Sequence, residues 1–345
     1  MNGTGEFSGF ELFHHGPQAD TSKLTALSQL ATRLPLRKQK KVLSAMSGGH
    51  ASAIRGRGLD YAENRLYQAG DDIRAMDWRV TARTGEAHIK VYQEERERPV
   101  LLVGDFRASM NFGSRRTLKQ LVCAELLSLL GWAAVREGDR LGALLFSETD
   151  ELDIRPRTGN RQVLQLIRSI TDFCDHDTPR ASQSDEQQRF YQLMLNLRRI
   201  ARPGTAIYIV SDWRGMSSDA EAQLFQLRRH CDITAIQVHD PLEAELPDMG
   251  LMTLTDGHQR SNLHTHRQQR QQHQQAFAEH QQALHNHMMR LSTPLISVCT
   301  TDHPLTRLRE GMGFSQNASQ PINSGHSSAG RSPGSSDGSW KGGHN

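Results

Sequence analysis

A carboxylate and a hydroxyl follow directly on an apolar run near the middle of the chain. Asp105 and Ser109 come after residues 100–104, which read Val-Leu-Leu-Val-Gly, and a long apolar segment, residues 117–135, comes next. This order predicts a buried strand, a loop and a helix, and open α/β sheets bind ligands in loops at the carboxyl ends of such strands. Oxygen ligands suit a hard divalent cation, which we expect to be weakly bound Mg²⁺, with Mn²⁺ as the alternative.

A second carboxylate, Asp212, ends the apolar run that starts at residue 206. In a doubly wound sheet this run lies beside the strand that precedes Asp105, so both carboxylates are expected at one site. Arg107 lies in the same loop, and a guanidinium only donates hydrogen bonds. Three interpretations follow: Arg107 points away and a weak metal site remains, its guanidinium replaces the metal and meets an acidic partner group directly, or Asp105 only caps its own loop.

Short apolar runs alternate with longer helical segments over most of the chain. This pattern predicts an α/β fold with a doubly wound, mostly parallel sheet flanked by helices. Residues 151–155 alternate polar and apolar side chains, which favours an antiparallel edge strand paired with the second strand. The expected strands are residues 100–104, 141–146, 206–210, 233–238 and 295–299, and the expected helices are residues 117–137, 160–173, 185–201, 218–230 and 265–291.

Composition divides the chain into four parts. Residues 1–35 are polar, residues 36–98 form a basic linker and a charged block, residues 99–312 form the α/β domain, and the Ser- and Gly-rich residues 313–345 predict a disordered tail. The α/β domain is thus preceded by an irregular extension. Residues 33–58 carry seven Lys or Arg and no Asp or Glu, which is typical of a solvated face and leaves a phosphate- or acid-binding patch as the alternative.

The overall composition excludes several classes of protein. A net charge of +3 is too small to indicate a nucleic-acid partner by itself. The four cysteines lie far apart without a Cys-x-x-Cys pair, which favours free thiols in a reducing compartment. Residues 1–20 lack the apolar centre of a secretory signal, and the longest apolar stretch is too short to span a bilayer. A cytoplasmic protein is expected, with peripheral membrane contact left open.

The charged block contains Tyr67-Gln-Ala-Gly-Asp-Asp-Ile-Arg-Ala-Met-Asp-Trp78. It resembles the hallmark of the DUF58 family, in which such a block precedes a von Willebrand factor A-like core. The loop from Asp105 to Ser109 is similar to that core's metal-ion-dependent adhesion site, Asp-x-Ser-x-Ser, with Arg107 in place of the middle serine. The resemblance implies that Thr158 completes a metal set with Asp105, Ser109 and Asp212. It also implies a MoxR-type AAA+ ATPase as partner.

The block itself has two interpretations. Forks between arginine and carboxylate groups, backed by Trp78, would lock the segment onto the sheet, or the same groups would form a docking surface. The candidate partner-binding residues are Asp71, Asp72, Arg74, Asp77, Trp78 and, from the strand-end loop, Arg107.

The function that these features favour is a non-enzymatic protein-interaction module, acting with a MoxR-type ATPase on a client protein complex. The chain has no Gly-x-x-x-x-Gly-Lys-Ser/Thr loop. Histidines at 266, 273, 280 and 287 are spaced by seven, which puts them about 10 Å apart on one helix, too far for chelation. The alternatives are a metal-dependent hydrolase and, with less support, a nucleic-acid-binding module.

Overall fold

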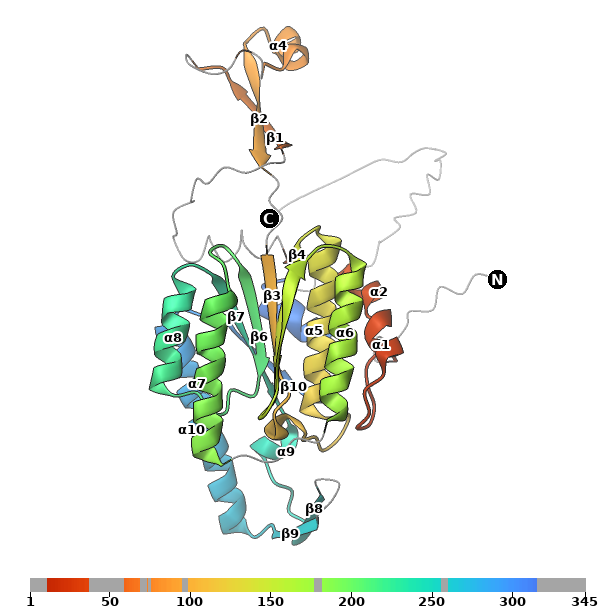
Figure 1. The fold of residues 1–345 in the computed structure, drawn as a ribbon, viewed down its shortest axis with the longest axis vertical. Coiled ribbons are helices and arrows are strands. Elements are labelled where there is room, and N and C mark those ends of the chain that lie inside the picture. The colour runs from red at the N-terminus through yellow and green to blue at the C-terminus, as the bar shows by residue number, and fades with distance from the viewer. Residues whose placement is uncertain are drawn as a thin grey trace, which may run out of the picture. The chain divides into compact units, whose positions relative to one another are not determined.

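The computed structural model describes residues 11–36, 59–68, 73, 76–94, 99–176, 182–255 and 260–314. Its centre is a six-stranded sheet in the order β10-β7-β6-β3-β4-β5 (Figure 1). All neighbouring strands are parallel except β5, which pairs antiparallel with β4. This confirms the predicted doubly wound sheet and its edge strand. The strands are β3 (Pro99–Asp105), β4 (Arg140–Phe146), β5 (Glu151–Arg157), β6 (Ala206–Ser211), β7 (Asp232–His239) and β10 (Leu295–Cys299).

Helices cover both faces of the sheet, as Figure 1 shows. Alternate residues of a strand point to opposite faces, and β3 follows this rule: Val100 and Leu102 pack with α5 and α6, whereas Leu101 and Val103 pack with α7, α8 and α10. Because both faces are covered, the central strands are almost wholly apolar. The helices are α5 (Lys119–Arg136), α6 (Asn160–Asp175), α7 (Gln183–Ile200), α8 (Ser218–Arg228), α10 (Arg267–Arg290) and α11 (Pro304–Gly311).

The N-terminal segment belongs to the folded α/β unit, and its prediction as a separate polar segment was wrong. The short helices α1 (Thr21–Ala26) and α2 (Ser28–Ala31) place Leu24 and Leu27 in the same core cluster as α5 and α6. The segment is also tied down by the buried carboxylate of Glu125, which accepts a hydrogen bond from Nδ1 of His14 at 3.0 Å and two from Arg116. Leucines three residues apart were the sequence signal for this apolar stripe.

The charged block lies between two paired strands in the sequence, where an irregular extension was predicted. The strands β1 (Leu59–Leu66) and β2 (His88–Glu94) pair antiparallel, and α4 (Trp78–Thr84) lies between them in the sequence. A second antiparallel pair, β8 (Leu251–Thr255) with β9 (Arg260–His264), was not predicted. Most of the basic run, from residue 37, and the tail from residue 315 lie outside the described residues. Among the helices that the structure describes, none is long and apolar enough to cross a membrane.

Candidate functional site at the carboxyl edge of the sheet

The topology brings the two predicted carboxylates together. β3 and β6 are adjacent and parallel, with Gly104 opposite Val210, so Asp105 and Asp212 follow neighbouring strands at the same edge. Ser211 links them directly, because its hydroxyl donates a 2.7 Å hydrogen bond to Oδ2 of Asp105. The prediction of one site at this switch point is confirmed.

Arg107 lies over both carboxylates instead of pointing away. Its Nη2 is 2.6 Å from Oδ2 of Asp105 and 3.5 Å from Oδ1 of Asp212, and its Nε donates to Oδ1 of Asp105 at 3.0 Å. The guanidinium also lies 5.5 Å from the ring centres of Phe146 and Phe190. Only 1% of the side chain is exposed. The direct contact of Arg107 with a partner, predicted from the sequence, is therefore wrong, because the group is sealed inside the protein.

Sequence reasoning missed a second buried cation, Lys119. Its Nζ is 3.1 Å from Oδ2 of Asp212 and 2.8 Å from Oε1 of Glu243, and the side chain is 0% exposed. Glu243 comes from the short helix α9 (Pro241–Ala244). A lysine at the first position of an almost wholly apolar helix was the available signal. A cation is unfavourable at a helix N-terminus, so the lysine requires carboxylate partners nearby.

Arg214 is the third cation, and it reaches the surface. Its Nε is 3.6 Å from Asp212 and its Nη2 is 3.2 Å from Glu243, and 43% of the side chain is exposed. The residue before it, Trp213, is fully buried and has a φ of 62°. Its backbone N–H donates to the hydroxyl of Ser211, and its indole N–H donates to the carbonyl of Ile236. A tryptophan in the left-handed region costs of order 1–3 kcal/mol, which these bonds and the burial offset.

We call the following six residues the strand-end cluster: Asp105, Arg107, Lys119, Asp212, Arg214 and Glu243. Its charges balance, with three carboxylates and three cations. Burial alone raises the pKa of Asp212, but the charges of Lys119, Arg107 and Arg214 together outweigh burial and hold this pKa well below its usual range. Burial lowers the pKa of Arg107, and the carboxylates outweigh that effect, so the guanidinium stays charged.

The cluster does not fit a divalent cation. Mg²⁺ and Mn²⁺ are held by carboxylate and other oxygen lone pairs that are free to coordinate, and here Oδ2 of Asp105 already accepts hydrogen bonds from Arg107 and Ser211. Two fixed cations occupy the space beside the two aspartates. Within the described residues, no group of three or more His, Cys, Asp or Glu is arranged to hold a metal ion.

The other two predicted ligands, Ser109 and Thr158, lie at opposite edges of the sheet. Ser109 is on the 3-10 helix η2 (Ala108–Met110) in the loop after β3, and its buried Oγ has no hydrogen-bond partner in the described part of the chain. Thr158 follows β5, whose last residue, Arg157, pairs with Leu141 near the start of β4. Because Asp105 pairs with Phe146 at the other end of β4, Thr158 lies at the opposite edge of the sheet. Its assignment to the site is wrong.

The loop after β4 contributes Glu148 to the site in place of Thr158. Its Oε1 accepts a hydrogen bond of 2.8 Å from the backbone N–H of Ala108, inside the strand-end loop. Burial raises the pKa of Glu148, and the nearby charge of Asp105 raises it further, against the effects of this hydrogen bond and of Arg107. Sequence reasoning missed this residue.

Helix α10 borders the site through its evenly spaced histidines. The Nε2 of His280 lies 3.2 Å from the carbonyl oxygen of Asp212, and the Nε2 of His273 lies 3.0 Å from the carbonyl oxygen of Leu242. His287 pairs with Glu221 at 2.6 Å. These three histidines are partly buried and lie at the border of the buried stripe of α10.

The charged block offers an exposed group and a helix cap. Trp78 is 67% exposed, and the carboxylate of Asp77 accepts hydrogen bonds from the N–H groups of Arg79 and Val80 at the start of α4. Asp77 therefore has a local structural role. The remaining candidates of the block, Asp71, Asp72 and Arg74, lie outside the described residues.

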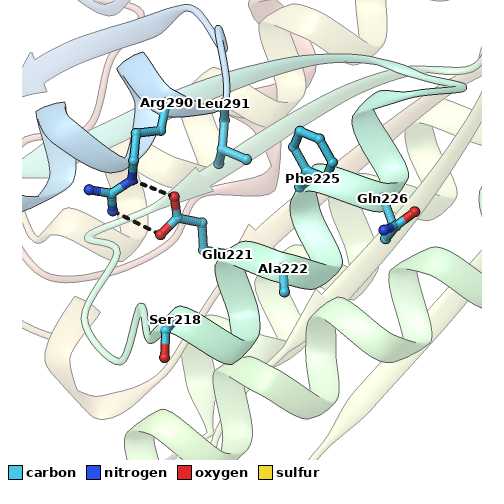
Figure 2. Close-up of a pocket in the computed structure, with 7 residues that line it drawn as sticks. All are labelled: Ser218, Glu221, Ala222, Phe225, Gln226, Arg290 and Leu291. Carbon is cyan, nitrogen blue, oxygen red and sulfur yellow. Dashed lines mark hydrogen bonds and ion pairs between the residues drawn. The ribbon is translucent and has the colours of Figure 1, made fainter.

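A pocket of 380 Å³ lies between α8 and the end of α10. Figure 2 shows Phe225 among the residues that line the pocket, together with the ion pair of Glu221 and Arg290. The Nε of Arg290 lies 2.8 Å from Oε1 of Glu221. None of the residues that line it belongs to the strand-end cluster.

The sequence profile of the family described as "Protein of unknown function DUF58" matches residues 63–284. The chain belongs to this family. The matched range contains the whole strand-end cluster and Trp78. Uncharacterized proteins of Mycobacterium bovis and of Mycobacterium tuberculosis are each 32% identical to this DUF58 protein over 223 residues, which is 65% of this chain and 68% of theirs.

The solved structures that are similar to this DUF58 protein include the following two. One is an aerotolerance-related membrane protein from Bacteroides fragilis, with 14% identity over 63% of this chain and 100% of the other, and a TM-score of 0.39. The other is the conserved hypothetical protein BatB from Bacteroides thetaiotaomicron, with 12% identity over 56% of this chain and 98% of the other, and a TM-score of 0.32.

Proposed function

We propose that this protein is a non-enzymatic interaction module that works with a MoxR-type AAA+ ATPase in the assembly or maturation of another protein complex. The observation that carries the proposal is the state of the carboxyl edge of the sheet. Open α/β sheets bind ligands at this edge, and here the edge carries a preformed cluster of paired charges. Arg214 brings one of those charges to the surface.

The reactive groups of the site support binding over catalysis. The hydroxyl of Ser211 is fully buried, donates to Asp105 and accepts the N–H of Trp213. A serine nucleophile needs a base that can take its proton, whereas the carboxylate that Ser211 contacts is neutralised by Arg107. The hydrolase alternative therefore gains no support from this residue. The nucleic-acid alternative depends on the basic run, of which only residues 33–36 are described.

Arg214 is the group best placed to contact the partner. Its Nη1 has no hydrogen-bond partner in the part of the chain that the structure describes, while Nε and Nη2 face Asp212 and Glu243. Arginine is enriched among the residues that dominate binding energy, and a guanidinium edge matches a carboxylate. The partner surface that fits this edge carries an acidic side chain.

The test measures the affinity of the full chain for the purified MoxR-type ATPase of the same organism, by calorimetry. We expect Arg214→Ala to weaken binding at least tenfold. Arg229→Ala is the matched control, because Arg229 is also exposed but lies just after α8, towards the start of β7 and the opposite edge of the sheet. Equal affinities for the wild type and both variants would exclude Arg214 as a contact, and no binding by the wild type would refute the partnership itself.

A further inference from the structure

We infer that Arg107 and Lys119 are built-in replacements for a divalent cation, which close the strand-end cluster to metal ions and hold its loops permanently in one arrangement. The exclusion of divalent cations follows from the geometry of this chain alone. Its consequence, that partners bind here without metal, rests on the proposed function.

The carboxylate oxygens of both aspartates already accept hydrogen bonds from protein donors. Oδ1 of Asp105 accepts hydrogen bonds of 3.0 Å from both the backbone N–H and the Nε of Arg107, and Oδ2 accepts from Nη2 at 2.6 Å. Oδ1 of Asp212 accepts from the N–H of Arg214 at 3.1 Å, and Oδ2 lies 3.1 Å from Nζ of Lys119. A cation that coordinates at about 2.1 Å would have to displace these donors.

Arg107 is enclosed by the protein. Its guanidinium lies 5.5 Å from the ring centres of Phe146 and Phe190, and its Nη2 also donates to the carbonyl of Arg214 at 3.0 Å. With only 1% of the side chain exposed, the charge cannot turn into solvent to make room. Arginine does not lose its proton in proteins, so its repulsion of a cation is permanent.

Arg107 and Lys119 also join the loops around the site to one another. Through Arg107, the loop after β3 is bonded to the loop after β6, and through Lys119 the start of α5 is bonded to both Asp212 and α9. In an ordinary metal site the cation supplies these links. Here the chain supplies them itself, so the face is already assembled at rest and does not depend on the supply of metal.

The inference is tested with Mn²⁺ and the full-length chain by NMR, because a bound Mn²⁺ broadens nearby amide signals. A chain with 17 histidines has other places for Mn²⁺, so the readout is site-specific: the amides of Ser109 and Trp213. We expect no selective broadening of these two signals up to about 1 mM Mn²⁺, the weak end of protein cation sites. Saturable broadening of both signals in the wild type would overturn the inference.

A gain of metal binding provides the complementary test. In the double variant Arg107→Ser, Lys119→Gln both internal cations are gone and an oxygen ligand is added, so Mn²⁺ should broaden the same amides at a concentration at least tenfold lower. Arg115→Ser is the control, since it removes a positive charge that is exposed in the same loop region, and it should behave like the wild type. A folded double variant without this gain would also overturn the inference. If the double variant does not fold, the wild-type measurement still decides.

Discussion

The strand-end cluster and the β1–α4–β2 unit both contain charged residues, but the environments of their side chains differ. The first buries most of its charged groups, and the second leaves an aromatic side chain exposed. In the strand-end cluster, Arg107 and Lys119 are buried and each contacts a carboxylate. In the β1–α4–β2 unit, Trp78 is 67% exposed and Asp77 caps α4. The residue types of a motif therefore do not tell whether it binds a ligand or stabilises the fold. Burial decides this: it gives Arg107 and Lys119 a structural role, whereas Arg214 and Trp78 remain exposed.

The largest effect that this comparison predicts is on stability. Arg107→Met should lower the free energy of unfolding by about 3–5 kcal/mol, because it leaves Asp105 buried with a charge that has lost its main partner. Urea unfolding followed by circular dichroism measures this. Arg214→Met is the matched control in the same cluster, and because Arg214 is partly exposed the loss should stay within about 1 kcal/mol. Similar losses in both variants would contradict the distinction between buried and exposed cations.

The second prediction is that acid destabilises the protein through Asp212. The folded-state pKa of Asp212 lies below its usual range, so its contribution to stability is present above the unfolded pKa of about 3.9 and is lost as pH falls below that value. The free energy of unfolding then falls by up to about 1.4 kcal/mol per pH unit. Urea unfolding at pH 7, 4 and 3 should show that acid lowers this free energy less in Asp212→Asn than in the wild type. Asp219→Asn, in an exposed position, should follow the wild type.

The sequence predicted the sheet and the meeting of Asp105 with Asp212 because both depend on local patterns. Apolar runs of strand length, separated by helical segments, determine a doubly wound sheet, and strand order then brings the two loops together. Lys119 and Glu243 could not be found in this way. They are 124 positions apart, and their contact depends on how α9 folds back over the start of α5.

Thr158 shows an error that the sequence itself could have prevented. Residues 151–155 were already predicted to be an antiparallel edge strand, and a strand that runs antiparallel to β4 carries its end to the opposite edge of the sheet from Asp105. The charged block shows the reverse case. Its sequence allowed both a scaffold and a docking surface, and no pattern in it predicted the exposure of Trp78.

The third prediction tests the recognition role of the β1–α4–β2 unit. Trp78→Ala should weaken binding of the MoxR-type ATPase by about 2 kcal/mol, or about thirtyfold, because an exposed tryptophan is a typical anchor of an interface. Its effect on the free energy of unfolding should stay within about 0.5 kcal/mol, as for other surface positions. Phe225→Ala is the control, an exposed aromatic on α8. A stability loss above about 1 kcal/mol with unchanged affinity would instead make Trp78 part of a scaffold.

The smallest expected effect separates the two roles that Asp77 has been given. As the N-cap of α4, its carboxylate accepts hydrogen bonds of 3.1 and 3.2 Å from Arg79 and Val80, so Asp77→Ala should cost about 1 kcal/mol. Faster hydrogen exchange confined to residues 78–84 measures this loss, because α4 has no buried residue that ties it to a core. Asp77→Asn keeps a good cap and removes only the charge. If Asp77 is a cap alone, the asparagine variant should match the wild type in both exchange and ATPase affinity. A fall in its affinity with normal exchange would show that the carboxylate contacts the partner, and would place a charged contact next to Trp78 on the recognition side of the comparison.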